Sequence, residues 1–319
     1  MAGRISPARA RDPISPRPAG RLSPDPMNAP LRRFETRMTE RRWIPYALIL
    51  PSVIFLAVLF VLPLGQTIWL AFSASGSPSL ENFRRMAADL NFAPAVRNTL
   101  LLTAFVVPVQ IALSLLMGTM VAKVGRGRET ILWIWTIPLA ISDLAAGMVW
   151  LAILQNSGYL NSLLFSLGVI ERQTAWLTYQ TPVALFFAVA AAEIWRSTAI
   201  VLIVIVAGLN QVPKDFGEAA AVFGASRWTR FTRITLPLIR PALQSALILR
   251  TVLAFEVFAV VYALGGRNLP VLMGEAYVWQ HDNQNYAVAA AYAVLIMAIS
   301  LAATFVYIRA LRVDPARLP

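Results

Sequence analysis

Five charged residues lie inside long apolar segments of this chain and are the first candidates for chemistry. They are Asp143, Glu193, Arg196, Arg250 and Glu256. A charge inside a membrane-spanning helix costs about 2.5–3.5 kcal/mol on insertion scales, so it usually faces the interior of a helix bundle or a wet cavity. Glu193 and Arg196 are three residues apart and share a helix face. They therefore form either a structural ion pair or part of a solute pathway.

The composition argues against metal and covalent chemistry. The chain has no cysteine and one histidine, His281, so it provides no thiol nucleophile and no basis for a histidine-based metal or catalytic site. No segment matches the phosphate-binding pattern G-x-x-x-x-G-K-[ST]. We therefore predict that this chain binds no metal and no nucleotide cofactor, and that any phosphate binding belongs to a separate protein.

Long apolar runs are the elements that must position these charges. Of the 319 residues 58% are hydrophobic and 14% charged, whereas the apolar share of soluble domains is about 45–50%. About 20 apolar residues cross the hydrocarbon of a bilayer. We predict an all-α integral membrane protein with six transmembrane helices, at about 44–72, 99–122, 131–154, 182–209, 242–264 and 286–311.

The basic residues alternate between the connections, as six spans require. The termini and the connections on the side of the 210–240 loop hold 21 Lys or Arg, and the opposite connections hold 5. The positive-inside rule then predicts that both termini and this loop are cytoplasmic. The formal charge of +12 is spread over short loops, a distribution that orients helices in a membrane and predicts no nucleic-acid partner.

The N-terminal region differs from the rest of the chain. Residues 1–40 are rich in Pro, Arg, Ser and Ala and lack apolar periodicity, which predicts a disordered basic cytoplasmic tail. Residues 41–319 are predicted to form the six-helix transmembrane domain. Met27 and Met38 are alternative starts that would shorten the tail, and no signal-peptide pattern precedes the first apolar run.

A polar, basic loop at about 210–240 separates the fourth and fifth apolar runs. Pro213 is followed by residues that favour helix until Gly224, which suits a turn, so we expect a helix, a glycine turn and a second helix. Pro237 and Pro241 should interrupt the helix that follows.

The second helix of this loop is predicted to have two faces. Arg227, Arg230 and Arg233 recur every three residues and should lie together, while an apolar face should hold Phe231, Ile234 and Leu238. A basic helix of this kind can rest on anionic lipid at the membrane surface. The alternative is that the loop meets a protein outside the membrane.

The order of residues in this loop resembles the cytoplasmic EAA loop of ABC importer permeases. The matching positions are Glu218, Ala219, Ala220, Gly224, Ala225, Ile234, Leu236 and Pro237. Phe223 departs from the pattern, because an Asp commonly precedes that glycine. Other segments resemble the carbohydrate-uptake branch of these permeases, the maltose and sn-glycerol-3-phosphate permease-like proteins: Ile137-Pro138, Gly158-Tyr159-Leu160-Asn161, Ala207-Gly208-Leu209, Gly265-Gly266 and Tyr286-Ala287-Val288-Ala289-Ala290-Ala291.

The resemblance implies a type I importer bundle in the bacterial inner membrane and a set of partners. In the family this loop is the coupling helix, which sits in a groove of a separate ATPase dimer that holds the ATP and Mg. The other implied partners are a second homologous permease, an extracytoplasmic solute-binding protein and membrane lipid. The implied cargo is an oligosaccharide, glycoside or polyol-type solute, of unspecified identity.

The resemblance also implies where the solute passes. A polar residue between two aromatic residues on the family's fifth helix touches the substrate, which points to Glu256 with Phe255, Phe258 and Tyr262. Sugars need hydrogen-bonding groups and aromatic faces in a partly dry cavity. Glu193 and Arg196 are further candidates for the substrate pathway.

Other interpretations remain open at this point. A secondary transporter would show inverted repeats with broken helices, which the sequence does not reveal. A membrane-embedded enzyme would need clustered acid, base or metal-binding residues, which the five scattered charges do not provide. Asp143 and Arg250 lie near predicted helix ends, where snorkelling or contact with another subunit is expected rather than ligand binding.

Overall fold

The computed structural model describes residues 43–311, so the predicted tail at 1–40 lies outside the described residues. The chain divides into two compact units, residues 1–62 and residues 63–319. The described part of the first unit is helix α2 (Ile44–Leu56) followed by the π-helix η1 (Ala57–Val61). Proline occupies the first turn of α2, where its missing N–H costs nothing. The large apolar side chains of this segment are exposed, as expected for a helix in lipid.

The second unit is almost entirely helical. Its elements are α3 (Leu62–Ala71), the short antiparallel pair β1 (Ser73–Ala74) and β2 (Ser77–Pro78), α4 (Glu81–Ala87), α5 (Phe92–Val121), α6 (Arg128–Thr136), the 3-10 helix η2 (Ile137–Ala140), α7 (Asp143–Leu154), α8 (Tyr159–Ser166), α9 (Pro182–Asn210), α10 (Lys214–Val222), α11 (Arg227–Arg230), the π-helix η3 (Phe231–Thr235), α12 (Leu236–Leu238), α13 (Arg240–Phe255), α14 (Ala259–Gly265), the 3-10 helix η4 (Gly266–Asn268), α15 (Leu272–His281) and α16 (Tyr286–Ala310).

Four continuous helical stretches are long and apolar enough to span a membrane: Pro45–Ala71, Phe92–Val121, Pro182–Asn210 and Tyr286–Ala310. Two bent pairs raise the number to as many as six. The first pair, Arg128–Ala140 with Asp143–Ser166, bends by 95°, and the second, Arg227–Leu238 with Arg240–Phe255, bends by 70°. The predicted fold class is confirmed. The continuous third span at 131–154 was wrong, because the chain breaks between Ala140 and Asp143, and the continuous fifth span at 242–264 was wrong, because α13 ends at Phe255 and α14 begins at Ala259.

The break in the third span has a local cause. Pro138 opens the 3-10 helix, and Ser142 then adopts an extended backbone and caps α7 by accepting a hydrogen bond from the backbone N–H of Ala145 at 3.2 Å. A new helix thus starts inside an apolar run. The predicted interruption by Pro237 and Pro241 is confirmed, because α12 ends at Leu238 and α13 begins at Arg240.

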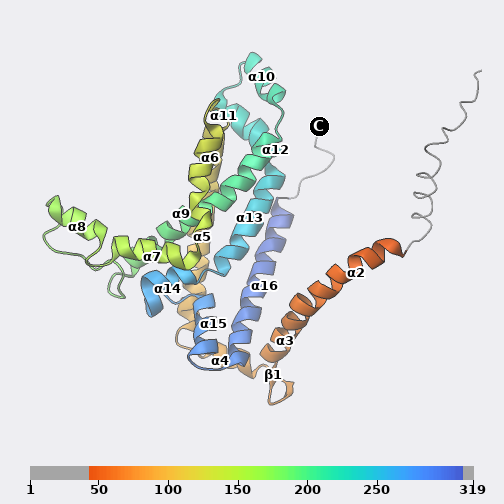
Figure 1. Ribbon diagram of the computed structural model, residues 1–319, viewed down its shortest axis with the longest axis vertical. Coiled ribbons are helices and arrows are strands. Elements are labelled where there is room, and N and C mark those ends of the chain that lie inside the picture. The colour runs from red at the N-terminus through yellow and green to blue at the C-terminus, as the bar shows by residue number, and fades with distance from the viewer. Residues whose placement is uncertain (1–42, 312–319) are drawn as a thin grey trace, which may run out of the picture. The chain divides into compact units, whose positions relative to one another are not determined.

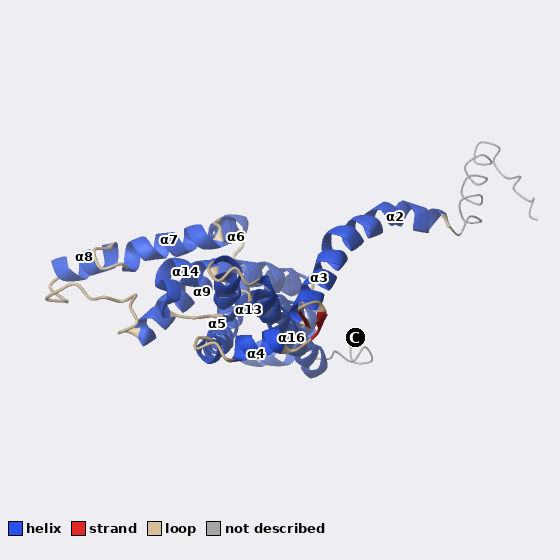
Figure 2. Cartoon of the chain, turned by 90° about the horizontal axis from the view of Figure 1, so that it is seen from below, coloured by secondary structure: helices blue, strands red, loops and turns tan. Residues whose placement is uncertain are grey.

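The core of the second unit forms where α5, α9 and α13 pack on one another, with α16 against α13 (Figures 1 and 2). Small residues let the backbones approach closely. A Cβ at Gly208 of α9 would lie 2.4 Å from the Cβ of Ala242 on α13, and one at Gly147 of α7 would lie 2.6 Å from the Cβ of Ala263 on α14. Within this unit, α10 and α11 lie at one end of the long helices, and α4 and α15 lie at the other (Figure 1).

Candidate functional site

The loop between α9 and α13 has the predicted order of helix, glycine turn and helix. Helix α10 ends in a Schellman motif, in which the N–H of Gly224 donates to the carbonyl of Ala221 at 3.0 Å and the N–H of Ala225 to that of Ala220 at 2.9 Å. Gly224 has φ +77°, a backbone conformation that side chains with a Cβ rarely adopt. The turn therefore depends on glycine, and it fixes the direction in which α11 leaves.

The tip of this loop presents apolar side chains to solvent. Val222 is 86% exposed and Phe223 is 90% exposed, and the predicted coupling residues Glu218 and Ala219 are also exposed. Ser226 then caps α11 by accepting a hydrogen bond from the N–H of Thr229 at 3.1 Å. Val222 and Phe223 therefore form an exposed apolar knob at one end of the second unit, a surface suited to contact with a partner protein.

The predicted division of the following helix into two faces was wrong. Residues 231–235 form a π-helix, whose wider turn shifts the register of every residue after Arg230. Arg227 and Arg230 consequently line one groove together with Phe231 and Ile234. Arg233 is exposed and does not line this groove. The remaining predicted loop positions, Leu236 and Pro237, are half-buried in α12.

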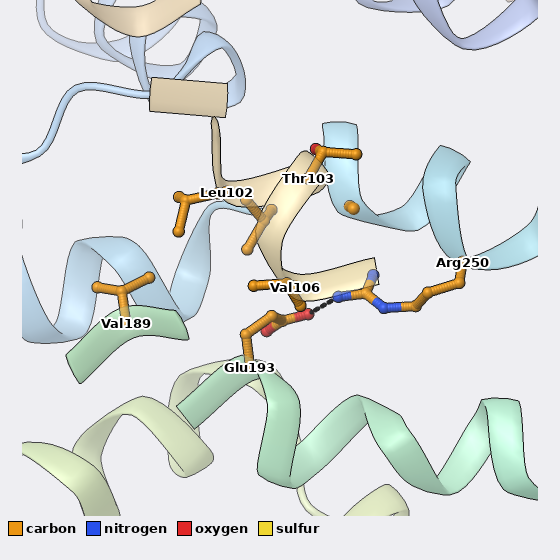
Figure 3. Close-up of a pocket in the computed structure, with 8 residues that line it drawn as sticks. Leu102, Thr103, Val106, Val189, Glu193 and Arg250 are labelled. Carbon is orange, nitrogen blue, oxygen red and sulfur yellow. Dashed lines mark hydrogen bonds and ion pairs between the residues drawn. The ribbon is translucent and has the colours of Figure 1, made fainter. Parts of the chain in front are cut away.

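The intramembrane charges form one connected cluster. The Arg250 guanidinium lies 2.6 Å from Glu193 Oε1 (Figure 3). It also donates from Nε to Gln110 Oε1 at 2.5 Å. The Ser197 hydroxyl donates to the same Glu193 oxygen at 2.9 Å. Glu193 is 4% exposed and Arg250 is 1% exposed, so this is a fully buried ion pair that joins α9 to α13 and, through Gln110, to α5.

A second arginine extends the cluster to α7. Arg196 Nη2 lies 3.6 Å from Glu193 Oε1, and Nη1 lies 2.9 Å from Asp143 Oδ1. Asp143 is half-exposed in the first turn of α7, where a carboxylate is favoured by the helix dipole. The predicted pairing of Glu193 with Arg196 is present in the structure, and their role in a solute pathway stays a prediction.

The expectation of snorkelling or subunit contact for Arg250 was wrong. Its partners, Gln110 and Glu193, are 140 and 57 residues away in sequence, so no local pattern reveals them. Glu193, Arg196, Arg250 and Gln110, from three helices, pair with one another here, although Glu193 Oε2 and Arg196 Nε are left without a hydrogen-bond partner within residues 43–311. The pairing offsets part of the cost of removing the charges from water.

A small cavity adjoins this cluster, lined by residues that include Thr103, Val106 and Val189 beside Glu193 and Arg250 (Figure 3). It holds about 10 Å³ of space for a water centre, which is about the size needed for one molecule. Thr103 Oγ1 and Glu193 Oε2 are buried and have no hydrogen-bond partner within residues 43–311. The cavity is far too small for a sugar.

The predicted fifth helix breaks at Glu256, between α13 and α14. Glu256 is exposed at this break, and Phe258 and Tyr262 follow it, with ring centroids 5.4 Å apart. Tyr277 of α15 stacks on Phe258 at 4.8 Å. A carboxylate therefore lies next in sequence to a cluster of aromatic rings, a combination suited to binding a polyhydroxylated solute.

Phe255 departs from the prediction for this group. It is 5% exposed and packs in the apolar core with residues of α15 and α16, among them Leu272 and Tyr292. Because its ring is already covered by the chain itself, a solute would reach it only by displacing the core. We therefore remove Phe255 from the candidate pathway.

A polar residue on α15, the helix that also holds Tyr277 of the aromatic cluster, was missed in the sequence analysis. Glu275 is 4% exposed, and burial, followed by the nearby charge of Asp89, raises the pKa of its carboxyl group. His281 at the end of α15 stacks on Tyr277 at 4.1 Å, while Asp282 lies 4.0 Å from Arg267. No group of three or more Asp, Glu, His or Cys residues within 43–311 is arranged to hold a metal ion.

Comparison with known proteins extends these observations. Residues 110–311 match the family described as binding-protein-dependent transport system inner membrane component. The chain is 30% identical to the trehalose/maltose transport system permease protein MalF of Thermococcus litoralis, over 83% of this chain and 92% of the relative. It is also 30% identical to the trehalose transport system permease protein SugA of Mycobacterium tuberculosis, over 87% and 91%.

Solved structures show the same fold. A chain in the crystal structure of a bacterial ABC transporter involved in the import of the acidic polysaccharide alginate superposes with a TM-score of 0.74, at 24% identity, over 86% of this chain and 97% of that chain. A second crystal structure, of the alginate transporter in complex with an alginate pentasaccharide-bound periplasmic protein, gives a TM-score of 0.73.

Proposed function

Because this chain belongs to the family of binding-protein-dependent transport system inner membrane components, we propose that it carries a carbohydrate across the membrane as one permease subunit of an ATP-driven importer. Members of this family are transport subunits and not enzymes. The observation that carries the proposal is the exposed apolar surface at Val222 and Phe223, which lies at one end of the bundle and supports contact with a coupling partner. The names of these relatives support a sugar as cargo.

The proposed partners follow from this arrangement. An ATPase dimer binds the knob, and ATP and Mg are held there and not by this chain. A second homologous permease completes the pathway, a proposal supported by the exposure of Glu256 and Tyr262 in this chain. An extracytoplasmic solute-binding protein delivers the cargo at the opposite end, which is supported by the alginate transporter crystallised with its periplasmic protein.

The orientation is testable because the chain has no native cysteine. We expect a cysteine at Ser226 to react with an impermeant thiol reagent from the cytoplasmic side only, and one at Thr178 from the opposite side only. The excess of basic residues on the side of Ser226 motivates this expectation. Labelling of both positions from the same side of sealed vesicles would refute the proposed topology.

The function itself is tested by uptake into proteoliposomes that contain the complex with its ATPase and binding protein. We expect uptake of a labelled disaccharide or polyol to require ATP and the binding protein together. Within that assay, Glu256→Ala should reduce uptake about tenfold or more, because one lost hydrogen bond to a charged group is worth about 1.5–3 kcal/mol. Basal ATP hydrolysis should not change, since Glu256 follows the far end of the 16-residue helix α13, about 24 Å along the helix from the loop that carries the knob.

The conservative variant separates charge from hydrogen bonding. Glu256→Gln keeps the acceptor oxygen and should retain most of the uptake if the solute uses a hydrogen bond. Glu129→Ala is a control, because it removes one exposed carboxylate from α6, away from the helix break. Wild-type uptake by Glu256→Ala would return Glu256 to a structural role, and ATP-independent uptake would favour a secondary transporter.

A further inference from the structure

A large groove lies between the ends of α5 and α9 and the loop that carries the knob. Its volume is about 850 Å³, far larger than the cavity at Glu193. Its apolar wall comes from α5, α9 and η3, with Leu115, Leu116, Leu209, Phe231 and Ile234 among its residues. The knob residues Val222 and Phe223 do not line the groove, so they remain free for another partner.

The groove carries cations and no anion. Lys123, Lys214, Arg227 and Arg230 line it, and no acidic side chain does so among the described residues. Arg230 Nη1 donates to the carbonyl of Gly217 at 3.2 Å, but its Nε is buried without a hydrogen-bond partner within residues 43–311. Four cations without a facing carboxylate favour an anionic ligand, because Arg and Lys form strong charge-assisted hydrogen bonds with phosphate oxygens.

The charges and the apolar wall are arranged by depth along the helices. Lys123 lies two residues beyond the end of α5 at Val121, and Lys214 lies shortly beyond the end of α9 at Asn210, so both are at the level where the spans end. Leu115 lies six residues before the end of α5, about 9 Å deeper at 1.5 Å per helical residue. A ligand that fits has an anionic group at the membrane surface and an apolar body along the helices.

We propose that this groove binds one anionic phospholipid from the leaflet at this end of the bundle. The phosphate group pairs with Arg230, Arg227 and Lys123, and the acyl chains lie along Leu115, Leu116 and Leu209. Basic pockets between transmembrane helices bind lipid head groups by the same combination of charge and apolar surface. The lipid then covers the side of the loop opposite the knob and holds η3 against α5. This inference does not depend on the cargo or on the ATPase.

The proposal predicts a selective loss of lipid binding. The purified intact complex is titrated with phosphatidylglycerol or phosphatidylcholine and its bound lipids are counted by native mass spectrometry. We expect the wild-type complex to retain one phosphatidylglycerol per copy of this chain more tightly than any phosphatidylcholine. Lys123→Gln with Arg227→Gln should weaken that retention about 30-fold, because each basic residue contributes about one kcal/mol of attraction.

Two controls separate a site from general attraction. Arg233→Gln with Arg240→Gln removes the same charge from exposed positions outside the groove and should leave the retention unchanged. Ala112→Trp fills the groove without changing charge and should abolish retention, whereas Leu101→Trp, exposed at the other half of α5, should not. Equal losses in both charge variants, or no loss with Ala112→Trp, would overturn the proposal.

A cross-linking measurement tests the occupant directly. A photoreactive maleimide on Leu116→Cys, in this otherwise cysteine-free chain, should couple to phospholipid in bilayers. Coupling to another protein subunit in place of lipid would show that a partner fills the groove and would also overturn the proposal.

Discussion

Replacing Gly224 with valine is expected to reduce solute-stimulated transport by tenfold or more while the chain still inserts into the membrane. The φ of +77° at this position is strained for any residue with a Cβ, and most of all for a β-branched one. No atom lies within 4 Å of a Cβ added there, so the effect comes from the backbone alone. The chain must leave the turn in another direction, which displaces α11 relative to the knob.

The matched control lies in the same loop. Gly217 is in the interior of α10, has an ordinary helical φ, and also has no atom within 4 Å of an added Cβ. Gly217→Val should therefore leave transport close to wild type. Both variants are assayed for co-purification of the ATPase and for ATP hydrolysis stimulated by the binding protein.

Two outcomes contradict the role of the knob. If Gly224→Val behaves like Gly217→Val, the loop is not the coupling element. If neutralising Arg227, Arg230 and Arg233 together abolishes coupling while Gly224→Val does not, the loop acts mainly through its contact with lipid. The triple variant also changes Arg233, which is exposed and lies outside the groove. It can therefore be distinguished from the variant that changes only Lys123 and Arg227 in the groove.

Replacing Arg250 with methionine should destabilise the second unit by about 3–5 kcal/mol, because it leaves Glu193 charged and unpaired in the core. The measurement is thermal unfolding of the purified chain in detergent, together with the yield of folded protein. Replacing both members, as Glu193→Met with Arg250→Met, should restore most of the lost stability, since an apolar pair of similar volume needs no compensation.

Arg196→Met is the comparison for this experiment. Arg196 is 13% exposed in its side chain and shares its charge between Glu193 and the half-exposed Asp143, so its loss should cost clearly less. Equal unfolding temperatures for Arg250→Met and Arg196→Met would contradict the central place of the Glu193–Arg250 pair.

The parts of the fold that depend on nearby residues were predictable from the sequence. The apolar runs gave the continuous spans to within a few residues at α9 and α16, and Gly224 marked the end of α10 within one residue. The break at Glu256 was not predictable, because neither proline nor glycine occurs in residues 251–263. The π-helix at 231–235 was likewise not predictable, since the pattern of apolar residues there fits an ordinary α-helix.

The contacts of the candidate site also divide into those that nearby residues predict and those that depend on the packing of separate helices. Glu193 and Arg196 are close in sequence, so their contact followed from helical spacing. The contacts of Arg250 with Gln110 and of Arg196 with Asp143 join separate helices, and only the packing of those helices brings them together. The roles of Glu256, Phe258 and Tyr262 in binding a solute stay predictions.

The close contact of Gly208 with Ala242 restricts how this sequence can change over evolutionary time. A methyl group at position 208 would overlap the one at position 242, because their Cβ atoms would be 2.4 Å apart. The two positions can therefore hold one methyl group between them, and alanine at 208 becomes acceptable only after 242 has changed to glycine. Among descendants of this chain the two positions are expected to change in that order, with the glycine–glycine pair as the intermediate.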